Sequence, residues 1–248
     1  MNQYFYEVFE NIPRQGPGNN ESTRKAFFQI QSHLPHQPEI LDIGCGKGVQ
    51  TIELATLSEG RITAVDNHQF FLDCLEKASK ERGSKELIRC VNADMTALPF
   101  QSASFDLIWS EGAVFIMGIK EGLLEWKKFL KKGGFLVLTD LIWLSDDRPE
   151  ELTRYWEKEC LYVLTLQEVL EAAQKENYSL VAHFTLPEEG WLKEYIVPQE
   201  KTIAELKTKY SSISEALETV QAIEFENEIV KKYIGCFGYE FFILRAEK

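Results

Sequence analysis

Short apolar runs and helix-spaced apolar positions alternate along the first part of the chain. The runs predict buried strands, and the three- and four-residue spacing between them predicts amphipathic helices. The predicted strands are residues 40–43, 61–65, 87–91, 105–109 and 135–139, and the helices between them are 49–57, 68–82 and 119–130. Strands that alternate with helices imply a parallel sheet with right-handed crossovers and helices on both faces. The predicted fold class is therefore α/β with a doubly wound sheet.

The sequence on either side of this core predicts further helices and two more strands. A capping-box pattern at 165–168 opens a helix, and apolar runs at 178–186 and 239–245 predict a sixth and a final strand. Another helix is predicted at 22–34, before the core. We expect a single domain that consists of an N-terminal flap and helix (1–37), a core (38–186) with a cap helix near 146–161, a helical insertion (187–238) and a final strand (239–248).

Two segments outside the core leave their roles open. Residues 1–20 begin with aromatic residues and end in a Pro/Gly-rich stretch, so they form either a flap over a site or a helix that packs on the body. In the insertion, apolar residues repeat at heptad-like spacing, and residues 212–215 have the pattern of a second capping box. The resulting helical pair closes over a substrate, joins two subunits of a homodimer, or packs its apolar stripe on the domain.

Composition limits the kinds of partner that the chain is expected to bind. Its 248 residues are 44% hydrophobic and 27% charged, as in ordinary globular domains, and the formal net charge is −12. Phosphate binding depends on clustered Lys and Arg, so an acidic chain predicts a small-molecule partner and no nucleic acid. The lysines within 127–132 precede two glycines, where cations complement a helix C-terminus.

The cysteines and the apolar stretches predict the environment of the protein. Its five cysteines are widely spaced and include no C-x-x-C pair, which predicts reduced thiols and no metal site. The first residues lack the apolar region of a signal peptide, and no uninterrupted apolar stretch approaches the roughly 20 residues that span a bilayer. We therefore expect a cytoplasmic protein that does not enter a membrane.

Three glycines at alternate positions follow the first predicted strand. Gly44, Gly46 and Gly48 lie between that strand and the first helix of the core. Glycine tolerates positive φ and lets the backbone approach a ligand, while the free N–H groups of a helix N-terminus face whatever binds there. The dinucleotide fingerprint has the spacing G-x-G-x-x-G, but Val49 stands where its last glycine belongs. This spacing predicts a ligand-binding turn and disfavours a nicotinamide dinucleotide.

Polar residues follow the carboxyl ends of the other predicted strands. In a parallel sheet these ends meet at one edge, and ligands bind there at the switch point of the strand order. The residues predicted to gather at this edge are Asp66, Asp94, Ser110, Glu111 and Asp140. Each acid taken alone is typical of a turn or a cap. Together they place acceptors for ribose hydroxyls at Asp66 and for an adenine amine at Asp94.

Several short motifs occur together between residues 39 and 140. They are the run Asp42-x-Gly44-x-Gly46-x-Gly48, the acid Asp66, the segment 92–94, and the segments 98–100 and 105–106 that lead into the fourth strand. In this combination the chain resembles the class I S-adenosylmethionine-dependent methyltransferases. The resemblance implies a Rossmann-like, mostly parallel, seven-stranded sheet whose final strand runs antiparallel between the fifth and the sixth.

The resemblance also implies S-adenosyl-L-methionine as the cofactor and indicates the residues that bind it. The residues concerned are Asp42, Gly44, Cys45, Gly46, Gly48, Asp66, Asn67, Asp94, Met95 and Ser110. Charge complementarity adds Arg14 as a partner for the methionine carboxylate of the cofactor. Methyl transfer from a sulfonium is an in-line displacement in which positioning supplies much of the rate, so no metal is required. Glu111 is the candidate catalytic residue, as the group that orients or deprotonates the acceptor.

The segment after the fourth strand narrows the acceptor. Residues 110–113 replace the Asn/Asp-Pro-Pro-aromatic motif of methyltransferases that act on DNA bases or glutamine, and no Cys follows a Pro as it does in cytosine C5 enzymes. We therefore expect methyl transfer to a small neutral or cationic metabolite, as in the small-molecule branch of the family. The alternatives are a non-catalytic S-adenosylmethionine-binding or interaction protein and, less favoured, a nicotinamide-dependent oxidoreductase.

Overall fold

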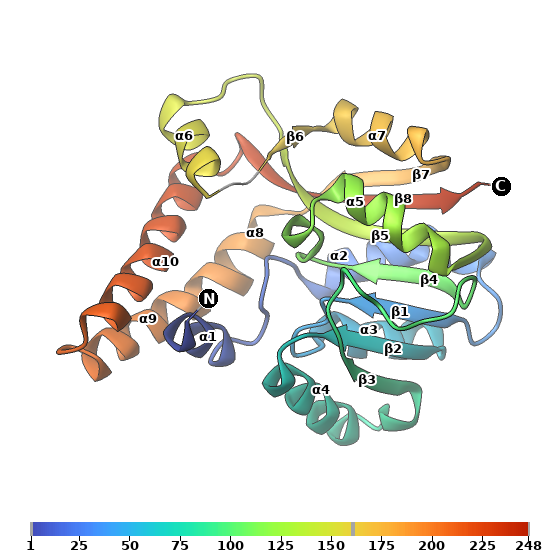
Figure 1. Cartoon of the computed structure of the whole chain (residues 1–248), viewed down its shortest axis with the longest axis horizontal. Helices are drawn as coiled ribbons and strands as arrows, with labels where there is room; N and C mark the ends of the chain where they lie inside the picture. Colours follow the sequence, from blue (N-terminus) through green and yellow to red (C-terminus); the bar gives the residue numbers. More distant parts are fainter. Residues whose placement is uncertain (1, 160–161, 248) are drawn as a thin grey trace.

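The strands form one mixed sheet in the computed structural model, which describes residues 2–159 and 162–247. The strand order along the sheet is β3-β2-β1-β4-β5-β8-β7 (Figure 1). The strands are β1 Glu39–Ile43, β2 Arg61–Asp66, β3 Ile88–Asn92, β4 Phe105–Ser110, β5 Leu130–Trp143, β7 Tyr178–Thr185 and β8 Phe237–Ala246. This architecture confirms the predicted α/β class with its doubly wound sheet.

Helices cover both faces of the sheet, because successive strand residues point to opposite faces. The helices of the core are α2 Asn20–Phe28, α3 Val49–Ser58, α4 Gln69–Glu81, α5 Ile119–Trp126 and α7 Leu166–Lys175. In β5, Val137 belongs to the apolar cluster that includes α2 and α3. Its neighbours Leu136 and Leu138 belong to the opposite cluster, which includes α5 and α7.

The last strand is antiparallel and lies inside the sheet, as predicted. Strands β1 to β5 pair in parallel, whereas β8 runs antiparallel between β5 and β7. Phe242 of β8 lies opposite Leu138 of β5 and His183 of β7, so this strand is paired along both edges. A two-residue strand, β6 Leu164–Thr165, pairs with the end of β5 and was absent from the sequence prediction.

A second group of helices lies along the edge of the sheet where the parallel strands end (Figure 1). They are α1 Gln3–Glu10, α6 Glu150–Lys158, α8 Glu188–Trp191, α9 Val197–Lys209 and α10 Ser214–Tyr233. A π-helical turn, η5 Leu192–Ile196, joins α8 to α9, so residues 188–209 form one helical run. Val8 of α1 packs on Ile203 of α9 and Val220 of α10, which fixes the N-terminal helix to the predicted insertion.

The fifth strand is longer than the sequence predicts. It begins at Leu130, passes through Gly133 and ends at Trp143, so Asp140 lies within the strand. Its pairing with β8 extends from Phe135 to Trp143 and supplies the hydrogen-bond partners that a five-residue strand would lack. The predicted helix at 119–130 ends correspondingly early, at Trp126, and a 3-10 turn follows it.

The helix caps confirm one prediction and correct two. Thr165 and Glu168 form the predicted reciprocal capping box of α7. The box predicted at 212–215 is absent, because the cap residue of α10 is Ile213, which has no side-chain acceptor. Asn67 precedes the helix predicted at 68–82 and is predicted to cap it, but His68 occupies the cap position of α4, and the His68 backbone N–H donates to Asp66 Oδ1.

Two predicted helices are shorter in the structure. The helix predicted at 22–34 ends at Phe28, and a 3-10 turn, η1 Gln31–His33, follows before Pro35. The cap helix predicted near 146–161 is observed as α6, which begins at Glu150. Residues 160 and 161 of that prediction lie outside the described residues.

Candidate functional site

The loop between β1 and α3 adopts the backbone conformation that its glycines predict. Gly44, Gly46 and Gly48 have φ values of 72°, 53° and 79°, in the left-handed region that disfavours side chains. The N–H groups of Gly44 and Cys45 each donate to the Val65 carbonyl oxygen at 2.9 Å. The loop is thereby tied to β2, and its remaining N–H groups lie at the edge of the sheet.

Asp66 at the end of β2 is bound to this loop. Its Oδ2 accepts a hydrogen bond from the Gly46 N–H at 2.9 Å, and its Oδ1 accepts one from the His68 N–H at 2.9 Å. Burial raises the pKa of Asp66, and these two backbone donors oppose the rise. The predicted ribose acid and the glycine loop therefore form one unit, with Asn67 exposed beside them.

Asp42 lies beneath the loop, fully buried. Its Oδ2 accepts hydrogen bonds from Thr51 Oγ1 at 2.6 Å and Gln50 Nε2 at 3.4 Å, while its Oδ1 has no partner among the described residues. Burial raises the pKa of Asp42 to about 7. The structure thus places this predicted cofactor residue where it fixes the first turn of α3 against β1.

The ends of β3 and β4 complete the edge. Asp94 is exposed, and its Oδ1 accepts from Thr96, which lowers the pKa of Asp94. Met95 lies close to Gly44, while Ser110 is buried and donates to the Ile43 carbonyl oxygen at 2.9 Å. We call the edge formed by residues 44–48, 66–67, 94–95 and 110–113 the glycine crevice.

The N-terminal segment crosses the glycine crevice. Gln15 Oε1 accepts a hydrogen bond from the Lys47 N–H at 2.8 Å, and a Cβ added to Gly46 would lie 2.6 Å from the same oxygen. Lys47 Nζ donates to the carbonyl oxygens of Glu10 at 2.7 Å and Ile12 at 3.0 Å. The side-chain oxygen of Gln15 therefore occupies an acceptor position on the glycine loop.

A contact between α1 and the start of α4 holds this segment in place. His68 Nε2 lies 2.7 Å from Glu10 Oε1, and the Tyr6 ring stacks on the His68 ring with centroids 4.3 Å apart. A cavity of about 650 Å³ opens beside this contact, between α1, Phe70 and Tyr210. The N-terminal segment therefore contains both features that the sequence left open. Its first part, α1, is a helix packed on the body, and the part around Gln15 crosses the glycine loop.

Glu111 is buried and is engaged by three side-chain donors. Its Oε1 accepts hydrogen bonds from Thr23 Oγ1 and Trp109 Nε1, both at 2.8 Å. Its Oε2 lies 3.3 Å from Arg14 Nη1, and Arg14 Nη2 donates to Asn20 Oδ1 at 2.9 Å. Burial raises the pKa of Glu111, and the charge of Arg14 opposes the rise. The predicted catalytic acid and the predicted carboxylate partner thus form an ion pair with each other.

Sequence reasoning missed the contacts that the N-terminal segment makes. It singled out the stretch 14–18 as a flap but assigned no role to Gln15, Lys47 or Glu10 in holding it. No local pattern predicts these contacts, because they join residues more than thirty positions apart. The Pro/Gly composition of the stretch was the only sequence signal of an irregular crossing segment.

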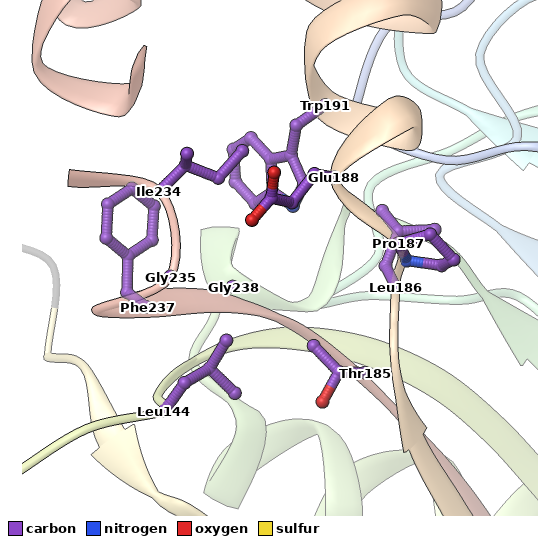
Figure 2. A pocket seen from close by; sticks show the side chains of 10 residues that line it. All are labelled: Leu144, Thr185, Leu186, Pro187, Glu188, Trp191, Ile234, Gly235, Phe237 and Gly238. Carbon is purple, nitrogen blue, oxygen red and sulfur yellow. The ribbon is translucent and has the colours of Figure 1, made fainter. Parts of the chain in front are cut away.

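A smaller cavity of about 240 Å³ lies outside the crevice, between the β7–α8 junction and the turn before β8 (Figure 2). Trp191, Leu144 and Phe237 line it, and the Glu188 side chain points into it (Figure 2). Among the described residues, no group of three or more His, Cys, Asp or Glu side chains is arranged to hold a metal ion. None of the described helices is long and apolar enough to cross a bilayer.

Comparison with known proteins identifies relatives of this site. Residues 41–138 match the family model of a methyltransferase domain. Residues of the chain are 29% identical to a dimethylglycine N-methyltransferase of Parasynechococcus marenigrum, over 49% of this chain and 44% of that protein. They are 30% identical to a malonyl-[acyl-carrier protein] O-methyltransferase of Enterobacter lignolyticus, over 56% of this chain and 52% of that protein. The chain thus spans about half the length of these curated relatives.

Solved structures share the fold over nearly the whole chain. The structure of YjhP from E. coli superposes with a TM-score of 0.84 at 20% identity, covering 99% of this chain and 100% of that one. A Geobacter sulfurreducens S-adenosylmethionine-dependent methyltransferase, solved with S-adenosyl-L-homocysteine, superposes with a TM-score of 0.82 at 17% identity and 98% coverage of both chains. The helices along the sheet edge therefore belong to the shared fold.

Proposed function

The chain belongs to the class I S-adenosylmethionine-dependent methyltransferases, and from that premise we propose that it transfers a methyl group from S-adenosylmethionine to a small-molecule acceptor. The observation that carries this proposal is the hydrogen bond from the Gly46 N–H to Asp66, which holds the glycine loop against this carboxylate. Backbone donors and a carboxylate acceptor therefore lie side by side at the edge where ligands of such sheets bind.

The donors and acceptors of the glycine crevice fit the cofactor. The Lys47 N–H already donates to the amide oxygen of Gln15, and an oxygen of a ligand can accept the same kind of bond. The carboxylates of Asp66 and Asp94 suit ribose hydroxyls and an adenine amine as donors. When bound, S-adenosylmethionine supplies a methyl group on a sulfonium centre. We propose that residues 44–48, 66–67 and 94–95 hold it, with Ser110 at the end of the crevice.

The N-terminal segment has the role of excluding water in this proposal. It crosses the loop through Gln15 and is tied to β4 through the Arg14–Glu111 ion pair. Displacement reactions benefit when the reacting groups are held together in a site from which water is removed. In this proposal an oxygen of the cofactor replaces Gln15 Oε1 at the Lys47 N–H, and the segment opens to admit the cofactor.

The role proposed for Glu111 is to position this segment. Both of its carboxylate oxygens are engaged, by Thr23, Trp109 and Arg14, and its pKa is raised by burial. A general base needs a free oxygen within hydrogen-bond reach of the proton that it takes. The predictions that Glu111 acts on the acceptor and that Arg14 binds the methionine carboxylate both require this ion pair to open first.

Other parts of the sequence interpretation stay predictions. Two of the relatives are named for the small molecules dimethylglycine and sterol, which supports a small-molecule acceptor for this chain, and another is named for a malonyl group on an acyl-carrier protein. Four further expectations stay predictions. They are the homodimer through the insertion, the absence of a nucleic-acid partner, the cytoplasmic location and the boundaries of the single domain. A non-catalytic cofactor-binding protein is the second candidate, since the Glu111 carboxylate is engaged.

Isothermal titration calorimetry with S-adenosylmethionine, S-adenosylhomocysteine and NAD tests the proposal. Asp66→Ala is expected to weaken binding of S-adenosylmethionine at least about tenfold, or about 1.4 kcal/mol, because the variant loses a carboxylate acceptor in the crevice. Asp146→Ala removes an exposed acid before α6 and is the matched control. Selective binding of NAD by the native chain would contradict the proposal, and unchanged affinity in Asp66→Ala would place the site elsewhere.

A turnover screen separates the catalytic from the non-catalytic candidate. The native chain is incubated with S-adenosylmethionine and panels of amines, carboxylic acids and phenols, and formation of S-adenosylhomocysteine is measured. A catalytic protein converts at least one class above the background rate. Tight binding of the cofactor with no turnover on any class favours the binding protein.

A further inference from the structure

Six elements along the sheet edge bring together a carboxylate, three tyrosines and two unpaired N–H donors. We call this group the tyrosine chamber. Its members are Tyr155 of α6, Trp191 of α8, Tyr195 of η5, Gln199 of α9, Glu226 of α10 and Tyr239 of β8. These helices converge beside the carboxyl ends of β4 and β5 (Figure 1).

The chamber adjoins the glycine crevice through Tyr239. A Cβ added to Gly112, in the loop after β4, would lie 3.4 Å from Tyr239 Cε2. The Tyr239 ring also makes an edge-to-face contact with Trp191, with centroids 4.7 Å apart. Trp191 also borders the 240 Å³ cavity (Figure 2). The chamber therefore lies between the crevice and that cavity.

Glu226 supplies the charge of the chamber. Its side chain is partly buried and forms no ion pair with any of the described residues. Burial, together with repulsion from Glu159, raises the pKa of Glu226 to about 7, while the Tyr155 hydroxyl opposes the rise. The groups that act on it from the packed elements are thus the Glu159 carboxylate, which directly follows α6, and the neutral Tyr155 hydroxyl. A carboxylate in these surroundings is stabilised by a cation.

The tyrosines respond to the same carboxylate. Burial raises the pKa of Tyr195 and of Tyr239, and the charge of Glu226 adds to both increases. Asp140 acts on Tyr239 in the same direction. The hydroxyls therefore stay protonated, so their rings are neutral and electron-rich. Rings of this kind attract ammonium groups placed over their faces.

Two buried donors of the chamber have no acceptor. Gln199 Oε1 accepts from Asn227 Nδ2 at 3.2 Å, but Gln199 Nε2, which lies close to the Tyr195 hydroxyl, completes no hydrogen bond among the described residues. Trp191 Nε1 is likewise without a partner there. Buried polar groups are normally satisfied, so unpaired donors at a site indicate a bound group with acceptor atoms.

The backbone supports a ligand site at this position. Tyr195 lies in η5, a π-helical turn within an otherwise continuous helical run. Such turns cost regular hydrogen bonds and are frequent at functional sites, because they redirect side chains. Here the turn lies between Trp191 and Gln199, which both contribute to the chamber.

We propose that the tyrosine chamber binds the ammonium group of a small alkylamine, which makes the acceptor of the proposed methyltransferase an amine-bearing metabolite. Glu226 neutralises the ammonium charge, the tyrosine rings surround its alkyl substituents, and Gln199 and Trp191 donate to an oxygen elsewhere on the molecule. An anionic ligand would meet Glu226 and Asp140, and a neutral apolar one would leave the Glu226 carboxylate and both donors unpaired. Amine binding by the chamber does not depend on the proposed function. Only the identification of the bound amine as the methyl acceptor rests on it.

A pair of isosteric probes tests the inference on the full chain. N,N-dimethylethanolamine and 3-methylbutan-1-ol have the same shape, but only the first carries an ammonium group. Calorimetry without cofactor is expected to show at least about tenfold tighter binding of the amine, because only the amine neutralises Glu226. Equal binding of both probes, or no binding of the amine at probe concentrations of tens of millimolar, would overturn the inference.

Variants on α10 assign the preference to the chamber. Glu226→Gln is expected to abolish the tenfold preference, whereas Glu228→Gln, an exposed acid two residues along the same helix, is expected to keep it. A preference that survives in Glu226→Gln would assign amine binding to another site and reject the chamber. If Glu226→Gln does not fold, as circular dichroism would reveal, calorimetry on the native chain at pH 8 and pH 5 replaces it. Burial raises the pKa of Glu226 to about 7, so protonation should reduce the preference for the amine toward pH 5, and an unchanged preference would reject the chamber.

The two proposals fail separately. Binding of S-adenosylmethionine with no preference for the amine would leave the methyltransferase proposal intact and remove the amine-bearing acceptor. A preference for the amine in a chain that does not bind S-adenosylmethionine would do the reverse.

Discussion

The glycine crevice and the tyrosine chamber lie side by side but are built in different ways. In the crevice, the proposed binding groups are backbone N–H groups of a short loop, and Asp66 lies directly at the end of the neighbouring strand. In the chamber, side chains from α6, α8, η5, α9, α10 and β8 meet only because those elements pack together. The crevice is thus specified by local backbone geometry, and the chamber by long-range packing of side chains.

The two regions are expected to respond differently to amino-acid substitutions. The crevice depends on φ values that only glycine adopts easily, so single substitutions there strain the backbone. The chamber depends on buried charge, so its substitutions change electrostatics before they change shape. Substitutions that affect either backbone strain or buried charge, but not both, test this difference most directly.

The largest effect is expected at Gly48, which has φ of 79° at the start of α3. A Cβ there would overlap the side chain of Leu75, which is fully buried, in addition to straining the backbone. Gly48→Ala should lower the free energy of unfolding by about 4 kcal/mol, as positive φ and overpacking add. Urea denaturation measures the change.

Gly83→Ala is the matched control for this variant. Gly83 has φ of 73°, but a Cβ added to it meets nothing within 4 Å. Its expected cost is about 1 kcal/mol, from the backbone alone. Equal costs at the two positions would show that the contact with Leu75 relaxes freely and that the loop is less constrained than its geometry indicates.

The second effect concerns the ion pair that ties the N-terminal segment to β4. Arg14→Met removes the cation beside buried Glu111 and should cost about 3 kcal/mol at pH 8, because an unpaired carboxylate is left behind. The cost should shrink toward pH 5, since burial has raised the pKa of Glu111 and protonation removes its charge. Urea denaturation at the two pH values tests both statements.

An exposed ion pair supplies the comparison for Arg14. Arg154 and Glu150 pair on the surface of α6, where solvent screens them. Arg154→Met should change the free energy of unfolding by less than about 0.5 kcal/mol at either pH. If Arg14→Met were equally mild, the N-terminal segment would not be held by this pair, and its proposed role in covering the crevice would fail.

The sequence predicted the crevice far better than the chamber, for a physical reason. The strand, the glycines and Asp66 are specified by local patterns: an apolar run, residues suited to positive φ and an acid at a strand end. The fold class and the capping box at Thr165 followed from similarly local signals, whereas the antiparallel course of the last strand was implied by the family resemblance.

Long-range packing accounts for what the sequence left out. The length of β5 depends on its pairing with β8, more than a hundred residues later, and no local signal carries that information. The predicted role of Glu111 rested on its place after β4, whereas Arg14 and Thr23 reach it from the N-terminal region. Glu226 was not singled out, because an acid on a helix is usually solvated and only tertiary packing buries this one.

Buried acids offer a finer comparison of the two regions. Asp42 beneath the crevice and Asp140 in β5 both have pKa values raised by burial to about 7. Asp42 accepts hydrogen bonds from Thr51 and Gln50, whereas among the described residues Asp140 is supported by one donor, the N–H of Leu141. Glu240 lies opposite Asp140 in the β5–β8 register and pairs with His183 instead. Asp140 therefore has less support than Asp42.

Of the three main variants, Asp140→Asn is expected to have the smallest effect. The folded chain holds the Asp140 proton up to about pH 7 and the unfolded chain only up to about pH 4, so ionisation between these values destabilises the fold. The variant should gain about 2 kcal/mol in free energy of unfolding at pH 8 and nothing near pH 3. Urea denaturation from pH 3 to 8 measures this, with Asp146→Asn, an exposed acid, as control. Asp42→Asn should gain less, because its two donors already support the carboxylate. A loss of stability in Asp140→Asn at pH 8 would mean that the Asp140 carboxylate is paired with a cation. Asp140 would then resemble Glu111, whose carboxylate is paired with Arg14.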